Sequence, residues 1–168
     1  MQSQVDDITR KLRLYAGMMN QNLDKFLDYA AVPVVQIGQA AAPMGHKIHY
    51  RYVSLLAGKG HRMSKGSGEI AATYVPGNLK GSVKTMRFSR SKNTVFVGPK
   101  IARGRTTGKF GPSRPDAYYA HMVEHGTVHS RAKPYMDKAA AQGLPLAYKR
   151  LETAARMQHQ KFLAAHAR

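Results

Sequence analysis

The chain has 168 residues, of which 27 are Lys or Arg and 9 are Asp or Glu, giving a formal net charge of +18 at pH 7. This length suggests one domain, and a hydrophobic fraction of 43% is too high for a fully disordered chain. Because cysteine is absent, disulfides, zinc knuckles, iron–sulfur clusters and thiolate nucleophiles are excluded. The sequence shows no secretory signal, membrane-length apolar run or P-loop motif, so we expect a soluble intracellular protein with a negatively charged partner.

Residues 1–43 predict a helical N-terminal region. Apolar residues recur at steps of three and four, which predicts an amphipathic helix over about residues 4–31, with Ser3 at its N-cap. Pro33 is expected to kink or end this helix. A second apolar stretch, residues 34–42, predicts a short further helix. An apolar stripe of this kind usually faces a core or a subunit interface.

Residues 44–115 predict a small β-structure with long loops. A short strand is expected near residues 48–55, and the sequence of residues 75–78 is typical of a turn. Two β-prone runs, residues 79–88 and 94–98, flank a polar turn and predict an antiparallel hairpin.

Positive charge is concentrated in this middle region. Residues 38–115 carry fifteen Lys and Arg and one acid, Glu69, whereas residues 1–37 are neutral overall. Such a segment is either a solvated basic surface or one that faces nucleic-acid phosphate or an acidic protein. The cations that we single out for partner or DNA contact lie in predicted loops over residues 56–69 and 102–115. They are Lys59, Arg62, Lys65, Arg103, Arg105, Lys109 and Arg114.

A short helix is predicted after the second loop. Asp116 is expected to cap it and Gly126 to stop it, with Tyr119, Met122 and Val123 facing the sheet.

The rest of the chain is helical in pattern, over residues 134–142 and 146–167, with an interruption at Gly143-Leu144-Pro145. We therefore expect an α+β fold in one domain: a long N-terminal amphipathic helix, a small antiparallel sheet packed by helices, and a C-terminal helical extension. Within the single domain, 1–168, the regions are 1–43, 44–115 and 116–168.

Residues 121–125 match the HxxEH pattern of one class of zinc hydrolases, with His121 and His125 on the same helical face. Gly126 should end the helix before His129, and a third protein ligand is not evident in the sequence. We therefore assign no metal, no cofactor and no catalytic residue. His121 and His125 are interpreted as half-exposed helix residues at a subunit contact.

Three stretches together resemble a known family. They are residues 74–83 (YVPGNLKGSV), residues 94–99 (TVFVGP), and residues 118–127 (YYAHMVEHGT) followed by 132–136 (AKPYM). In order and spacing they resemble the neck and tail-component proteins of long-tailed double-stranded DNA phages, also called head–tail joining or tail-completion proteins. The motif positions are Gly77, Asn78, Leu79, Gly98, Tyr119, Glu124, Gly126 and Pro134.

The resemblance implies a structural virion protein and not an enzyme. It implies a homo-oligomeric ring, a hexamer, which joins the capsid connector to the tail around the DNA channel and contacts adjacent neck, connector and tail-tube proteins. Non-specific contact with channel DNA is then expected, membrane contact is not, and assembly takes place in the host cytoplasm before the protein resides in the virion. Residues 146–168 extend past the usual end of the family, so the resemblance assigns them no role.

The chemistry of the motif residues predicts structural roles by itself. Gly77-Asn78 favours a turn with positive φ, and Pro134 is expected to set the start of the next helix. Glu124 is expected either to pair with a cation or to cap backbone amides.

A second functional class also fits the sequence. The chain is strongly basic, and Tyr50, Tyr52 and Phe110 lie among cations, where aromatic rings could stack on bases. These features permit a basic nucleic-acid-binding module without enzymatic activity. A salt titration on duplex DNA separates this alternative from a neck protein.

Overall fold

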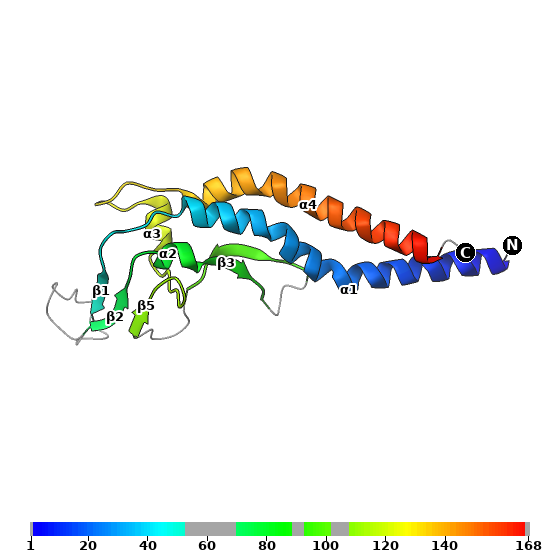
Figure 1. Cartoon of the computed structure of the whole chain (residues 1–168), viewed down its shortest axis with the longest axis horizontal. Helices are drawn as coiled ribbons and strands as arrows, with labels where there is room; N and C mark the ends of the chain where they lie inside the picture. Colours follow the sequence, from blue (N-terminus) through cyan, green and yellow to red (C-terminus); the bar gives the residue numbers. More distant parts are fainter. Residues whose placement is uncertain (1, 53–69, 89–92, 102–107, 167–168) are drawn as a thin grey trace.

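The computed structural model describes residues 2–52, 70–88, 93–101 and 108–166. It has the expected α+β fold. In chain order the elements are α1 (Gln2–Ala41), β1 (His49–Tyr52), β2 (Ile70–Tyr74), α2 (Asn78–Ser82), β3 (Val83–Met86), β4 (Phe96–Pro99), β5 (Gly108–Phe110), α3 (Ala120–His125) and α4 (Tyr135–His166). Figure 1 shows α1 and α4 side by side along the long axis, with α3 and the strand-bearing part at the end of the molecule away from the chain termini.

The N-terminal helix is longer than the sequence predicts. Pro33 lies inside α1 and does not end it, and the predicted second helix over residues 34–42 forms the last turns of the same helix. Because Pro33 is buried and its neighbours Ala30 and Val34 are core residues, packing offsets the missing backbone hydrogen bond. Ser3 lies within the first helical turn and not at the N-cap, because α1 already begins at Gln2.

The interruption predicted at residues 143–145 is also absent, since α4 is continuous from Tyr135 to His166. Pro145 is exposed, and so is Ala141, whose carbonyl loses its helical partner to the proline ring and can be solvated instead. Gly143 is buried against α1, and a methyl group placed there would lie 2.8 Å from Val34 Cα. The glycine therefore serves close helix contact and does not break the helix.

The two long helices, hereafter the helix pair, run antiparallel in a regular register. Gly38 faces Ala139, Val34 faces Gly143, and the Tyr15 ring contacts the Phe162 ring with centroids 5.1 Å apart. Moving toward the N-terminus of α1 by some number of residues corresponds to moving toward the C-terminus of α4 by the same number. By this register Lys11 lies opposite His166, the last residue of α4. The first turns of α1 consequently extend past α4, as Figure 1 shows.

The strands form two small sheets. β1 pairs antiparallel with β2, and β5 pairs parallel with β2 on its other side. The predicted antiparallel hairpin is confirmed as β3 and β4, with Val83 opposite Pro99. Its first strand begins at Val83 and not at residue 79, because residues 78–82 form the short helix α2. Arg87, beyond β3, ties the hairpin to α1 through Asp24 and Asp28.

Two of the strands have no counterpart in the sequence predictions, and a third matches its prediction in part. The strand expected near residues 48–55 is present as β1 over its described residues, 49–52. β2 was not predicted at all, and β5 lies inside the stretch 102–115 that was expected to be a loop. Because β5 runs parallel to β2, the three-stranded sheet is mixed and not purely antiparallel. Short strands of this kind depend on their neighbours more than on their own sequence.

Tyr119 joins two small clusters of buried residues. One gathers around Leu79, Val83 and Tyr135 and the other around Tyr74 and Phe110, and Tyr119 packs against both. Val123 packs against the first cluster, as expected, whereas Met122 is 43% exposed and does not face the sheet.

Candidate partner-binding site

The turn before α2 needs its glycine. Gly77 has φ of 81°, a left-handed backbone conformation that is strained for any residue with a side chain. A methyl group at this position would also lie 3.1 Å from Pro112 Cγ. The Val75 N–H donates to the Phe110 carbonyl at 2.9 Å, which joins the turn to the end of β5. The predicted positive φ is confirmed at Gly77, although the turn leads into a helix and not directly into a strand.

Asn78 clamps this turn to the segment before α3. Its Nδ2 donates to the Asp116 carbonyl at 2.8 Å and to the Tyr119 hydroxyl at 3.1 Å, and its Oδ1 accepts from the Asp116 N–H at 3.0 Å. Asn78 is only 1% exposed, and its two bonds to the Asp116 backbone are buried, while the bond to Tyr119 is partly buried. Two motif stretches that lie far apart in sequence are held together by one side chain.

Asp116 does not cap α3, contrary to the sequence prediction. The helix begins at Ala120 with Tyr119 at the N-cap position, and the buried Asp116 carboxylate accepts from the Tyr74 hydroxyl at 3.1 Å. Burial raises the pKa of Tyr74 above its usual value; Arg51 opposes this shift and Asp116 adds to it. Tyr74 therefore remains a neutral hydroxyl donor at physiological pH.

Glu124 caps the N-terminus of α4. Its carboxylate accepts from the N–H groups of Tyr135 at 3.0 Å, Met136 at 3.1 Å and Asp137 at 3.0 Å, which the helix itself leaves without partners. Of the two roles predicted for Glu124, amide capping is the one observed. Pro134 directly precedes α4, as predicted.

The HxxEH pattern does not form a cluster of ligands. Glu124 is engaged at the start of α4, and both His121 and His125 are exposed. In the part of the chain that the structure describes, no three His, Asp or Glu side chains gather in a way that could hold a metal ion.

Gly126 ends α3, as predicted. Its φ is 80°, and a methyl group there would lie 2.7 Å from the Ala132 nitrogen and 2.9 Å from the Ser130 carbonyl oxygen. The chain folds back tightly here, and the Lys133 N–H returns to the Val123 carbonyl at 2.8 Å. We refer to residues 74–79, 116–126 and 130–137 together as the motif corner.

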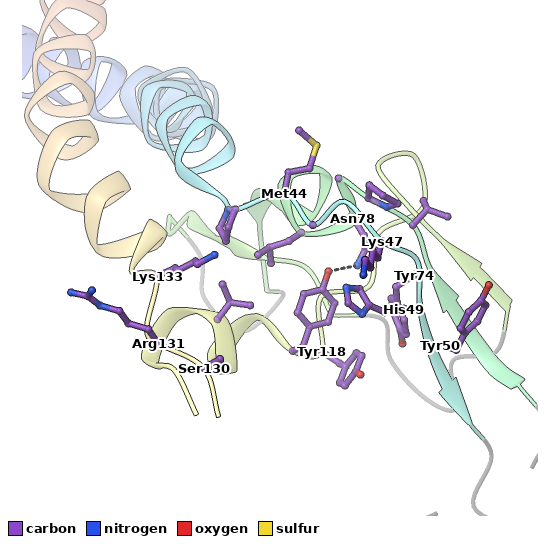
Figure 2. A pocket seen from close by; sticks show the side chains of 18 residues that line it. Met44, Lys47, His49, Tyr50, Tyr74, Asn78, Tyr118, Ser130, Arg131 and Lys133 are labelled. Carbon is purple, nitrogen blue, oxygen red and sulfur yellow. Dashed lines mark hydrogen bonds between the residues drawn. The ribbon is translucent and has the colours of Figure 1, made fainter. Parts of the chain in front are cut away.

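A groove of about 490 Å³ opens on the motif corner. We call it the tyrosine groove, because Tyr50, Tyr74, Tyr118 and Tyr119 contribute to its walls (Figure 2). Four of the motif positions named from the sequence line it: Gly77, Asn78, Leu79 and Tyr119. Its basic lining residues are Lys47, His49, Arg131 and Lys133, and no Asp or Glu in the described part of the chain lines it.

Three of these tyrosines, Tyr74, Tyr118 and Tyr119, form a contiguous aromatic cluster. The Tyr118 ring lies with its centroid 5.2 Å from that of Tyr74 and 5.4 Å from that of Tyr119. The Arg51 guanidinium lies 5.5 Å from the Tyr118 centroid. Burial raises the pKa of Tyr119, so its hydroxyl also stays protonated.

The structure brings together the motif residues but not the basic residues selected from the sequence. Lys59, Arg62, Lys65, Arg103 and Arg105 lie outside the described residues.

Lys109 in β5 and Arg114 are exposed, and neither lines the groove. Arg114 instead lies 5.5 Å from the Phe110 ring centroid. Gly98 is buried in β4, opposite Lys84.

Sequence reasoning missed the four basic residues of the groove. Lys47 and His49 follow α1 in the stretch MGHKIH, whereas Arg131 directly precedes the motif stretch 132–136 and Lys133 lies within it. Proximity to a motif stretch was a signal for Arg131 and Lys133 only. Lys47 and His49 lie far from the motif stretches in sequence, and only the fold places the two pairs around the same groove.

Large apolar side chains are also exposed along the helix pair. Ile8 and Leu12, 58% and 62% exposed, continue the α1 stripe that contacts α4 at Tyr15, and we call them the terminal stripe. Others are exposed on the flanks of α4, namely Leu144, Leu146, Tyr148, Met157 and Leu163. By contrast, more than half of the buried hydrophobic residues in the described chain are alanines.

Searches of family models, curated proteins and solved structures find no match to this chain. Among the described helices, none combines the length and apolar composition needed to cross a membrane.

Proposed function

We propose that this chain is a structural subunit of the head–tail junction of a long-tailed double-stranded DNA phage. Copies of it form a ring, a hexamer, that joins the capsid connector to the tail around the DNA channel, and the chain has no enzymatic role. The resemblance of three motif stretches supports the phage assignment. The ring rests on one observation, the apolar surface that a single chain leaves in contact with water.

The terminal stripe is the clearest part of that surface. Ile8 and Leu12 belong to the same helical face as Tyr15, but they lie at or beyond the end of α4. Each large apolar side chain contributes about 1.5–3 kcal/mol when a neighbour covers it. Residues 1–37 are also the neutral part of a strongly basic chain, so copies can associate there without strong repulsion.

Assembly is tested by negative-stain imaging of the purified chain and of virus particles, together with light scattering after size-exclusion chromatography. We expect annular density, located at the neck in particles. Leu12→Lys should weaken assembly at least about tenfold, because it places a charge in the apolar contact. Leu14→Lys is the matched control, since Leu14 is also exposed but lies off the stripe. Monomers of the unaltered chain at all concentrations would contradict the proposal.

One observation favours the nucleic-acid-binding alternative. Tyr50 and Tyr118 are 50% and 37% exposed and share the groove with basic residues, an arrangement on which unpaired bases can stack. A salt titration with duplex and single-stranded DNA decides between the two functions. Tight binding by the monomer at moderate salt would support the alternative, whereas weak binding by rings supports the neck role.

A further inference from the structure

The tyrosine groove carries basic residues on two sides. Lys47 comes from the connection between α1 and β1, His49 is the first residue of β1, and Arg131 and Lys133 come from the segment before α4. Figure 2 shows Lys133 and Arg131 on one side of the tyrosines and Lys47 and His49 on the other, with the Arg131 side chain directed away from the groove. A ligand lying in the groove therefore has cationic side chains on both flanks.

The acids near the groove do not offset this positive charge. Asp116 is fully buried behind the tyrosines, where it accepts from the Tyr74 hydroxyl. Glu124 is 8% exposed and engaged by three N–H groups of α4. Among the residues that the structure describes, no carboxylate lines the groove, so its described lining carries cationic charge only.

The lining also includes apolar side chains. Leu79 and Val123 lie beside the tyrosines, and Met44 and Val75 complete this part of the surface. A volume of about 490 Å³ accommodates a few side chains. A DNA duplex is a thick rod with phosphates on its outside, so it could reach the rim cations but would leave the apolar surface unfilled.

We propose that the tyrosine groove binds an acidic segment of a neighbouring protein that carries an aromatic or apolar side chain between its carboxylates. The aromatic side chain packs on the tyrosines, and the carboxylates pair with Lys47, Lys133 and the other flanking cations. Within the ring proposed above, this segment belongs to the next layer of the neck or tail. Only the identity of the neighbour rests on that proposed function.

The inference is tested by fluorescence anisotropy with the full chain. The probe is a fluorescein-labelled peptide of Asp, Glu and Phe, and its control is the same peptide with Asn and Gln in place of the acids. Lys47→Glu combined with Lys133→Glu should weaken binding of the acidic peptide at least about tenfold. Lys149→Glu combined with Lys161→Glu makes the same charge change on exposed positions of α4, and should change the affinity less than about twofold.

Two further measurements make the test decisive. Lys47→Ala combined with Lys133→Ala should also weaken binding, which covers the case in which charge reversal impairs folding, and circular dichroism checks the fold of each variant. The inference is overturned if the neutral peptide binds as well as the acidic one, or if both charge-reversed pairs lose affinity equally. It is likewise overturned if single-stranded or duplex DNA binds more tightly than the peptide and competes for the same lysines.

Failure here is distinguishable from failure of the proposed function. If rings form normally but do not bind the acidic peptide, only the groove inference is overturned. Monomers that bind the peptide through Lys47 and Lys133 would support the groove inference and contradict the ring.

Discussion

The motif corner and the helix pair are stabilised in different ways. The corner is held by buried polar side chains with specific partners, above all Asn78 and Glu124. In the described part of the chain, no buried side-chain nitrogen or oxygen lacks a hydrogen-bond partner. The helix pair instead relies on small residues such as Gly38 and Gly143 that let two backbones approach.

The two regions differ in whether one chain by itself satisfies its side chains. A buried polar network is stable only when every member is satisfied, so the motif corner must be complete within one subunit. Two helices packed through small residues bury little apolar surface, and their larger side chains remain available to other copies. The corner therefore holds the tyrosine groove in place, while the helix pair carries the exposed apolar side chains on which the proposed ring depends.

The largest effect should come from Gly126→Ala in the motif corner. The added methyl group meets the Ala132 nitrogen at 2.7 Å in a backbone with φ of 80°, so we expect a loss of about 3 kcal/mol or more in the free energy of unfolding. Gly17→Ala is the matched control on α1. Nothing lies within 4 Å of its new methyl group, and it should stabilise by up to about 1 kcal/mol. Urea unfolding of both variants measures the contrast, and similar effects would refute it.

A smaller loss is expected from Glu124→Gln. The amide keeps one acceptor oxygen but lacks the negative charge that three N–H groups of α4 face. We therefore expect the free energy of unfolding to fall by about 2 kcal/mol. Glu152→Gln, which removes the exposed ion pair with Arg156 on α4, should cost less than about 0.5 kcal/mol. Urea unfolding measures both variants. Equal losses would contradict the prediction, because the buried Glu124 cap would then contribute no more to stability than the exposed Glu152–Arg156 ion pair.

The smallest effect is expected at alkaline pH. Burial, followed by the charge of Glu124, raises the pKa of Tyr135 to about 12 from the ordinary value of 10.0. The unfolded chain then loses this proton at lower pH than the folded chain, so stability is complete below pH 10.0 and falls as the pH rises toward about 12. Tyr135→Phe should make this decline shallower by removing one titrating group. A pH series of urea unfolding checks it, and an unchanged slope would contradict the assignment.

Local sequence chemistry was sufficient for several features of the site. Gly77 in a left-handed turn, Gly126 at a helix end and Pro134 before a helix all depend on the conformational limits of one or two residues. The β3–β4 hairpin depends on two adjacent β-prone runs. These features could be predicted because the deciding atoms lie within a few residues of each other.

The sequence by itself determined the α+β class, the amphipathic first helix, the hairpin and the glycine-dependent turns. Only the tertiary structure decided that helices continue through Pro33 and Pro145, that Asp116 bonds Tyr74, and that Glu124 caps α4. It also decided that Lys47 and Lys133 share a groove. The reason is physical: a local penalty or preference of about 1–3 kcal/mol is outweighed when a side chain is buried beside partners distant in sequence.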